Sequence, residues 1–299
     1  MTFLEKLQMI VTEDKILQEE PLSAHTSFRI GGPAQYFLLP EEEEELVRLV
    51  ALCVEEKMPY LLLGNGSNVL AKDEGLRGVV ICTKSLQGIS WEDGNRVTAQ
   101  CGLLLGAMAA DVLKHSCTGF EFASGIPGTV GGAVLMNAGA YGGEMKDCMV
   151  SARTLTREGT VKEYTAQELE LSYRHSILQD NGEILLSATF HFEPGDSEEI
   201  RSKMRELNQR RREKQPLEYA SAGSTFKRPE GYFAGKLIDD AGLRGYRVGD
   251  VMVSEKHCGF VVNVGDGTYA QAMEVIGHVQ EEVLAQFGVE LRLEVRQIG

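Results

Sequence analysis

The sequence predicts an α+β protein, and three observations support this class. Helix-like and strand-like segments are grouped along the chain rather than strictly alternating. Segments of alternating apolar and polar residues dominate residues 81–200, whereas helices and strands alternate in residues 201–299. Asp-Gly and Glu-Gly turns separate neighbouring strand-like segments. We therefore divide the chain near residues 80 and 200, into 1–80, 81–200 and 201–299.

The sequence of residues 1–80 predicts a unit of strand, helix and strand. Its acidic run Glu41–Glu45 suits the first turns of a helix, where the helix dipole favours negative charge. A buried strand then leads into the glycine turn GNGSN. The expected elements are a helix over 3–19, a strand within 25–40, a helix over 41–57, and strands over 59–63 and 75–83.

The remaining two parts predict two hairpins, a helix between them, and a mixed C-terminal segment. A charged helix should end at Pro216, because proline lacks the backbone N–H that a helix interior needs. The expected elements are hairpins over 89–102 and 150–165, a strand within 182–195, helices over 103–115, 197–215 and 268–287, and a closing strand over 289–297.

The net charge of −14 argues against binding to nucleic acid. Residues 201–256 nevertheless carry 13 Lys and Arg against 8 Asp and Glu, which indicates a local site for an anion such as a phosphorylated small molecule; a charged surface helix is the alternative. The N-terminus lacks the uncharged core of a signal peptide, and no apolar run is long enough to span a bilayer. We expect a cytoplasmic protein without membrane insertion.

The six cysteines are scattered, with no Cys-x-x-Cys pair. This spacing predicts neither a metal site nor a disulfide framework, and we expect most of the cysteines to be small buried residues.

Two glycine-dense segments are candidate cofactor-binding elements. GNGSN (64–68) follows a strand, and its successive N–H groups could bind phosphate oxygens, although it matches neither a Rossmann nor a Walker motif. The segment 125–144 holds seven glycines among apolar residues. Bare backbone allows close approach to a ligand, so the pair suits a flavin dinucleotide, with Asn137 and Tyr141 as polar contacts. The alternatives are an ordinary tight turn and a glycine-rich corner without a ligand.

Three further residues are candidates whose neighbours alone do not establish a role. Ser224 in GSTFKRP could be a turn or cap residue, and Arg174 in YRHS could be a surface charge. Glu294 should lie on the polar face of the closing strand, between two arginines, or at a solvated strand edge. His175 has no partner at metal-ligand spacing, and we assign it no role.

Taken in order, seven motifs resemble the UDP-N-acetylenolpyruvoylglucosamine reductase (MurB) family of flavoenzymes. They are HTSFRIGG, LLLGNGSNVL, ASGIPGTVGGAVLMNAGAYGGE, LSYRHSIL, AGSTFKRP, KLIDDAGLRG and EVRQIG. The resemblance implies two subdomains, 1–80 and 81–200, that hold FAD non-covalently in the manner of vanillyl-alcohol oxidases. It implies that residues 201–299 form an α/β domain that binds a UDP-sugar, with the closing strand returning Glu294 to the active site.

The resemblance also implies the reaction. NADPH reduces FAD, and the reduced flavin passes a hydride to the enolpyruvyl group of UDP-N-acetylglucosamine enolpyruvate, which yields UDP-N-acetylmuramate. This step belongs to peptidoglycan precursor synthesis, and so to cell-wall biogenesis, cell shape and cell division.

By the same resemblance Ser224 is the proton donor, Arg174 stabilises negative charge at the substrate carboxylate, and Glu294 acts protonated or hydrogen-bonded. The implied FAD contacts are Gly64, Asn65, Gly66, Ser67, Asn68, Gly125, Ile126, Pro127, Gly128, Gly131, Gly132, Ala133, Asn137, Ala138, Gly139, Ala140 and Tyr141. The implied substrate contacts are Tyr173, Lys214, Lys227, Arg228, Arg244 and His257.

The chain departs from the family pattern at two points. Arg228 stands where some members have asparagine, and the short segment after YRHS leaves little room for a substrate-capping tyrosine loop. We therefore expect the shorter subtype.

Two rival functions remain open. The first is another flavin oxidase of the same superfamily, although GNGSN lacks the histidine that carries a covalent flavin in such enzymes. The second is a nucleotide-sugar binding protein without activity, which would be colourless after incubation with FAD.

Overall fold

The computed structural model describes residues 1–299, which form two compact units. Unit 1 comprises Met1–Gln18, Tyr36–Asn65 and Gly78–Arg211, and unit 2 comprises Glu19–Gln35, Gly66–Arg77 and Arg212–Gly299. Two early segments therefore fold with the C-terminal part of the chain. Each unit has its own buried apolar cluster, as expected of a separately packed body.

Unit 1 is built around two sheets. The first has the strand order β1-β2-β5-β3, and β3 runs parallel to β5; the ends of β1, β2 and β5 continue into the segments of unit 2. The second is antiparallel, in the order β12-β11-β13-β7-β6. The strands are β1 Ile16–Pro21, β2 Pro33–Leu38, β3 Tyr60–Leu63, β5 Leu76–Cys82, β6 Ile89–Glu92, β7 Arg96–Gln100, β11 Met149–Leu155, β12 Val161–Thr165 and β13 Ile184–His191.

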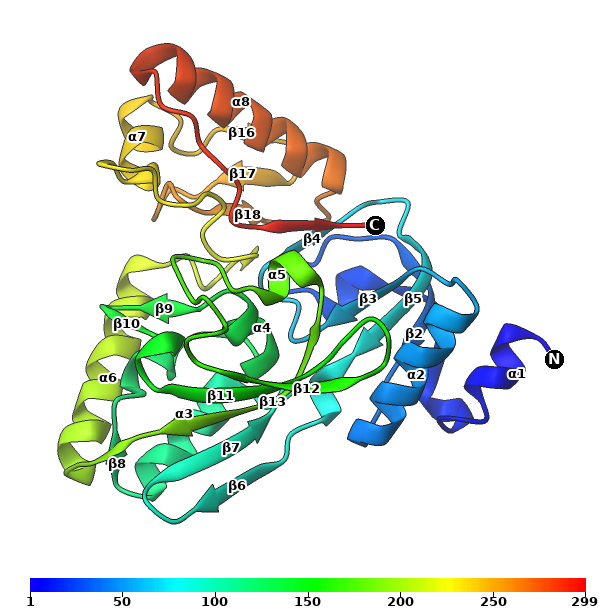
Figure 1. The fold of residues 1–299 in the computed structure, drawn as a ribbon. Helices are drawn as coiled ribbons and strands as arrows, with labels where there is room; N and C mark the ends of the chain where they lie inside the picture. Colours follow the sequence, from blue (N-terminus) through cyan, green and yellow to red (C-terminus); the bar gives the residue numbers. More distant parts are fainter. The chain divides into compact units, whose positions relative to one another are not determined.

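Helices and short strand pairs complete unit 1 (Figure 1). The helices are α1 Phe3–Leu7, α2 Glu43–Glu55, α3 Leu105–Lys114, α4 Val130–Leu135, α5 Leu178–Asn181 and α6 Ser197–Lys214, whose last three residues fall in unit 2. The short pairs are β9 Gly139–Ala140 with β10 Gly143–Glu144, and β8 Cys117–Thr118 with β14 Glu193–Pro194.

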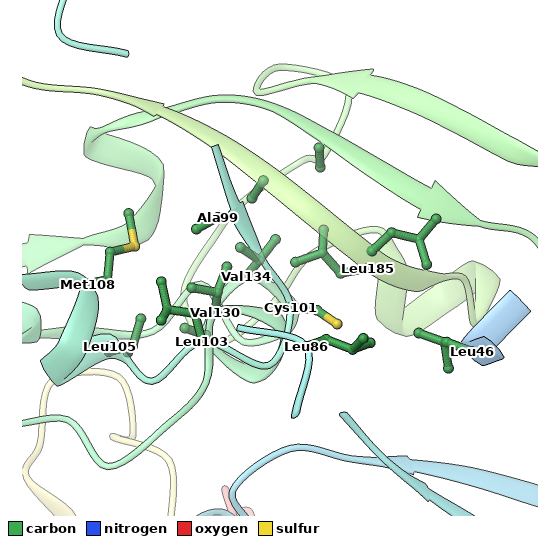
Figure 2. Close-up of a cluster of buried hydrophobic side chains, with 14 of the residues drawn as sticks. Leu46, Leu86, Ala99, Cys101, Leu103, Leu105, Met108, Val130, Val134 and Leu185 are labelled. Carbon is green, nitrogen blue, oxygen red and sulfur yellow. The ribbon is translucent and has the colours of Figure 1, made fainter. Parts of the chain in front are cut away.

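Helix α4 lies inside the glycine-rich segment, where the sequence did not predict a helix. Thr129 caps its N-terminus by accepting a hydrogen bond from the Gly132 N–H at 3.4 Å. Val130 and Val134 lie on the buried face of α4, in one apolar cluster with Leu103, Leu105 and Cys101 (Figure 2). Packing of these two valines offsets the poor helix propensity of Gly131 and Gly132.

Unit 2 has a small antiparallel sheet in the order β15-β18-β17-β16, and helix α8 packs along it (Figure 1). Thr268 and Gln271 form a capping box at the start of α8, and Gly288 ends it in a left-handed conformation. The elements are β4 Val69–Ala71, β15 Ala220–Ser221, β16 Arg247–Val248, β17 Val251–Val253, β18 Val261–Asn263, β19 Arg296–Ile298, α7 Ala234–Asp240 and α8 Tyr269–Phe287.

Most of the expected elements are confirmed, and two are wrong. The predicted helix over 3–19 stops at Leu7; a 3₁₀ turn at Glu13–Lys15 and the strand β1 follow. The closing strand is regular only in β19, and before it only an isolated bridge joins Leu293 to Phe226. In both places the sequence pattern predicted a longer element than the backbone forms.

The cysteines are buried and unpaired, as expected of small core residues. Burial raises the pKa of the Cys53, Cys101 and Cys148 thiols to about 12, so these thiols stay protonated near neutrality. No helix has the length and apolarity that crossing a bilayer requires.

Candidate active site

The two predicted cofactor segments meet in unit 1. The Asn65 side-chain amide donates to the Pro127 carbonyl at 2.7 Å, which ties the first glycine turn to the second segment. A Cβ on Gly64 would lie 2.4 Å from Thr129 Oγ1, so only glycine permits this approach. Residues about sixty positions apart in the sequence thus form one continuous backbone surface at the start of α4.

The glycines of this surface differ in what they face. A Cβ would clash at Gly125 with Asn208 Oδ1 at 2.4 Å and at Gly143 with the Phe122 ring at 2.5 Å. At Gly132 the nearest protein atom, Thr129 Oγ1, would be 3.7 Å from a Cβ. Protein packing therefore explains the first two glycines, whereas the room left beside Gly132 fits a cofactor that approaches the backbone.

Asn137, a predicted cofactor contact, is fully buried and has φ of +39°. Its Nδ2 donates to Glu144 Oε2 and to the Ser172 carbonyl, both at 2.9 Å, and its Oδ1 accepts the Lys146 N–H at 3.0 Å. The amide thus joins the glycine-rich segment to the turn that carries Arg174.

Arg174, the predicted catalytic arginine, lies against the predicted cofactor loop in the same unit. Its guanidinium donates to the Gly139 carbonyl at 3.3 Å and lies 5.2 Å from the Tyr173 ring centroid. Its φ of +56° belongs to a tight turn closed by the bridge between Ser172 and His175. Gln179 Nε2 donates to the Arg174 carbonyl at 3.1 Å and fixes this turn.

Unit 2 brings Ser224 and Glu294 onto adjacent backbone segments. The carbonyl of Thr225, next to Ser224, accepts the Glu294 N–H at 2.9 Å. Thr225 is buried, its N–H donates to the Gly259 carbonyl, and its Oγ1 accepts the Val261 N–H, both at 2.9 Å. Ser224 itself is exposed and Glu294 is half-buried, and the buried Thr225 joins their two backbone segments.

The last part of GNGSN folds within unit 2. Asn68 Nδ2 donates to the Glu294 carbonyl at 3.2 Å, and the Asn68 carbonyl accepts the Arg296 N–H at 3.0 Å. Gly66 has φ of +63°, and its carbonyl accepts the Ser27 N–H at 3.0 Å. Asn68 therefore supports the Glu294 segment, a role that the sequence did not reveal.

The predicted substrate residues of unit 2 differ in how far they are already engaged. Arg244 makes a two-pronged ion pair with Asp239, at 2.9 and 2.7 Å, and lowers the pKa of that carboxyl group. The Arg228 guanidinium lies 3.9 Å from the Phe233 ring centroid. Lys214 is exposed at the end of α6, and the backbone of Lys227 pairs with Arg292.

His257 is half-buried, and burial lowers its pKa. Its Nδ1 accepts the Gly259 N–H at 3.1 Å, so the proton of the neutral ring is assigned to Nε2. A neutral ring can offer this N–H to a ligand.

The fold and the comparisons define a flavin-dependent oxidoreductase with FAD as its cofactor. Residues 34–165 match the FAD binding domain family, and residues 215–298 match the C-terminal domain of UDP-N-acetylenolpyruvoylglucosamine reductase. About two thirds of the chain also superposes on an alkyldihydroxyacetonephosphate synthase, covering 40% of that chain, with a TM-score of 0.51 at 20% identity, which shows a shared fold alone.

Full-length relatives identify the family. A UDP-N-acetylenolpyruvoylglucosamine reductase from Lachnoclostridium phytofermentans is 54% identical, over 99% of this chain and 97% of its own length. The crystal structure of a MurB from Thermus caldophilus has a TM-score of 0.81 at 35% identity, over 95% of this chain and 100% of that chain. The chain belongs to the UDP-N-acetylenolpyruvoylglucosamine reductase family, as its seven motifs predict.

Proposed function

We propose that this protein reduces the enolpyruvyl group of UDP-N-acetylglucosamine enolpyruvate to UDP-N-acetylmuramate, with NADPH as hydride donor, in peptidoglycan precursor synthesis. One observation supports this most directly: Thr225 holds Ser224 and Glu294 on adjacent segments of a chain from this family. A hydroxyl group and a carboxyl group are both able to take part in the protonation that must follow hydride transfer to a carbon–carbon double bond.

When bound, FAD would supply the hydride-transfer chemistry that links NADPH to the terminal vinyl carbon of the enolpyruvyl group. Gly64, Asn65 and the segment from Gly125 to Tyr141 are the residues of unit 1 that would hold it. Gly132 would allow close approach, whereas Asn137, whose amide is engaged inside the protein, would shape the loop. In unit 2, Gly66, Ser67 and Asn68 would contribute the rest of the first glycine turn.

Ser224 would donate a proton to the carbon that becomes nucleophilic after hydride transfer. A serine hydroxyl is a poor acid near neutrality, so its action depends on a fixed position and polar neighbours. Thr225 provides the fixed position through its hydrogen bonds to backbone groups of Gly259, Val261 and Glu294.

Arg174 would stabilise negative charge that develops at the substrate carboxylate. Glu294 would act protonated or as a hydrogen-bonding group, because an ionised carboxylate would repel the enolate. Both roles concern the transition state more than substrate binding, so substitutions should lower kcat more than they raise KM.

The remaining contacts complete the proposal. Residues 1–80 and 81–200 would act as the cofactor subdomains and residues 201–299 as the substrate domain, in the shorter subtype without a capping tyrosine loop. Tyr173, Lys214, Lys227, Arg228, Arg244 and His257 would bind the UDP-sugar. The basic stretch 201–256 suits its diphosphate, and the reaction would take place in the cytoplasm.

A stopped-flow experiment tests the function. Flavin absorbance should bleach when NADPH is added without oxygen, and it should return when UDP-N-acetylglucosamine enolpyruvate follows. Recovery with oxygen and an alcohol or sugar, but not with the UDP-enolpyruvyl sugar, would instead identify a flavin oxidase.

A further inference from the structure

A carboxylate in unit 1 forms part of the support of Arg174. Glu144 is the one charged residue within the glycine-rich segment 125–144. We propose that Glu144, held by Asn137, is a positioning residue that orients the Arg174 guanidinium. This inference rests on the catalytic role proposed above for Arg174.

The backbone places Glu144 opposite the group that Arg174 contacts. In the short antiparallel pair of β9 and β10, Glu144 pairs directly with Gly139. The carbonyl of Gly139 accepts the hydrogen bond from the Arg174 guanidinium at 3.3 Å. Displacement of β10 would therefore move the acceptor that Arg174 uses.

Asn137 connects this strand pair to the turn that carries Arg174. One nitrogen, Nδ2, donates both to Glu144 Oε2 and to the Ser172 carbonyl, at 2.9 Å each. Ser172 begins the turn that ends at His175. Because Asn137 is fully buried, loss of either acceptor would leave a polar group without a partner in the interior.

Backbone conformation shows that the loop and the turn depend on such support. Asn137, Tyr141 and Arg174 have φ of +39°, +54° and +56°, in the left-handed region that residues other than glycine rarely adopt. Strained conformations of this kind persist when surrounding contacts hold them, and they cluster at functional sites. The bonds of Glu144 and Asn137 are such contacts.

Glu144 acts on Arg174 through its charge as well as through its hydrogen bonds. Lys146 Nζ lies 2.8 Å from Glu144 Oε2, and this contact, the Asn137 amide and the charge of Arg174 together lower the pKa of Glu144. Glu144 is therefore ionised at neutral pH, and its field acts on the guanidinium.

Glu144→Gln tests the proposal, because it removes the charge and keeps the side-chain size. Flavin reduction by NADPH should be unchanged, whereas reoxidation by the UDP-enolpyruvyl sugar should slow about ten- to a hundredfold, mainly in the limiting rate rather than in KM. Lys146→Gln is the matched control: it removes the partner of the same ion pair, and it should slow reoxidation about threefold or less. FAD content and melting temperature report whether each variant is folded.

A double-mutant cycle with Arg174→Lys completes the test. If Glu144 acts through Arg174, adding Glu144→Gln to Arg174→Lys should cause little further slowing. Equal effects of Glu144→Gln and Lys146→Gln, or slowing that multiplies in the double variant, would overturn the positioning role. If Arg174→Lys alone leaves reoxidation intact, the catalytic assignment of Arg174 itself fails, and that result is distinct from a harmless Glu144→Gln.

Discussion

Units 1 and 2 hold their candidate catalytic residues by different means. In unit 1, Arg174 has a left-handed backbone conformation, and the side chains of Asn137 and Gln179 donate hydrogen bonds to carbonyls of its turn. Glu144 in turn accepts a hydrogen bond from Asn137. In unit 2, Ser224 and Glu294 lie on segments joined through the backbone of Thr225.

The difference predicts how the candidate residues of each unit respond to substitution. Side-chain hydrogen bonds can be lost one at a time. Substitution of a residue near Arg174 should therefore disturb the orientation of the guanidinium even though Arg174 itself is unchanged. Backbone pairing survives most side-chain changes, so a substitution at Ser224 or Glu294 should remove a chemical group and leave its surroundings in place. Substitutions at these two residues of unit 2 should therefore change activity with the least effect on folding.

The largest expected effect follows from Ser224→Ala. Reduction of the flavin by NADPH should stay nearly intact, while turnover of the enolpyruvyl substrate should fall about 10²- to 10⁴-fold, because the variant lacks the proton donor. Rapid-mixing absorbance measurements of the two half-reactions would give both rates.

Ser221→Ala is the control, since Ser221 lies in β15 and bonds through its backbone to Ser27. This variant should behave like the unmodified protein. Equal slowing of both half-reactions in Ser224→Ala would contradict a role confined to protonation.

The second effect concerns Glu294→Gln. The variant should keep FAD and its fold, because backbone bonds to Thr225 and Asn68 hold this segment. Reoxidation by the UDP-enolpyruvyl sugar should slow about a hundredfold or more, as for a group that acts in proton transfer or orientation. Full activity would show Glu294 to be an ordinary strand-edge residue, and loss of FAD would show that it acts on the structure.

The sequence predicted the parts of the fold that depend on local pattern. The acidic start of α2 and the hairpin turn before β7 are both local signals, and each element appears where expected. The helix expected over 3–19 failed for the opposite reason. Apolar spacing favoured helix there, but Ile16 pairs in a sheet, and such pairing depends on distant strands.

Candidate catalytic residues could be proposed from the sequence, whereas the contacts that hold them could not. Ordered motifs predict Ser224, Arg174 and Glu294 as catalytic residues, and these roles stay predictions; the structure places Ser224 and Glu294 on adjacent segments. Glu144 and the structural use of Asn68 and Asn137 were missed, because they depend on contacts between residues far apart in the chain. The isolated charge of Glu144 in an otherwise uncharged glycine-rich segment was the one signal available.

Two glycines of unit 1 sharpen the distinction between packing and cofactor binding. Gly132→Ala should leave the apo-protein as stable or slightly more stable, because Gly132 is helical and has room for a Cβ. FAD affinity should nevertheless fall about tenfold or more, because the new methyl group would occupy the space beside the backbone. Gly143→Ala should lower stability by about 1–3 kcal/mol, because its Cβ would meet the Phe122 ring.

Thermal unfolding of the apo-proteins and titration with FAD measure these two effects separately. Unchanged FAD affinity in Gly132→Ala would place the cofactor away from α4. Loss of apo stability in that variant would mean that Gly132, like Gly143, is required by packing.

The smallest effect concerns His257 and pH. Burial, and secondarily the charge of Arg244, lower the pKa of His257 below its ordinary 6.5 in the folded protein. The unfolded chain therefore takes up the proton at higher pH, and unfolding becomes easier as the pH falls through about 6.5. In His257→Asn, the side-chain oxygen can still accept the Gly259 N–H two residues on, but it does not titrate. Melting temperatures at pH 7.5 and 5.5 should differ less in this variant than in the unmodified protein, and an equal difference would mean that other groups carry the pH dependence.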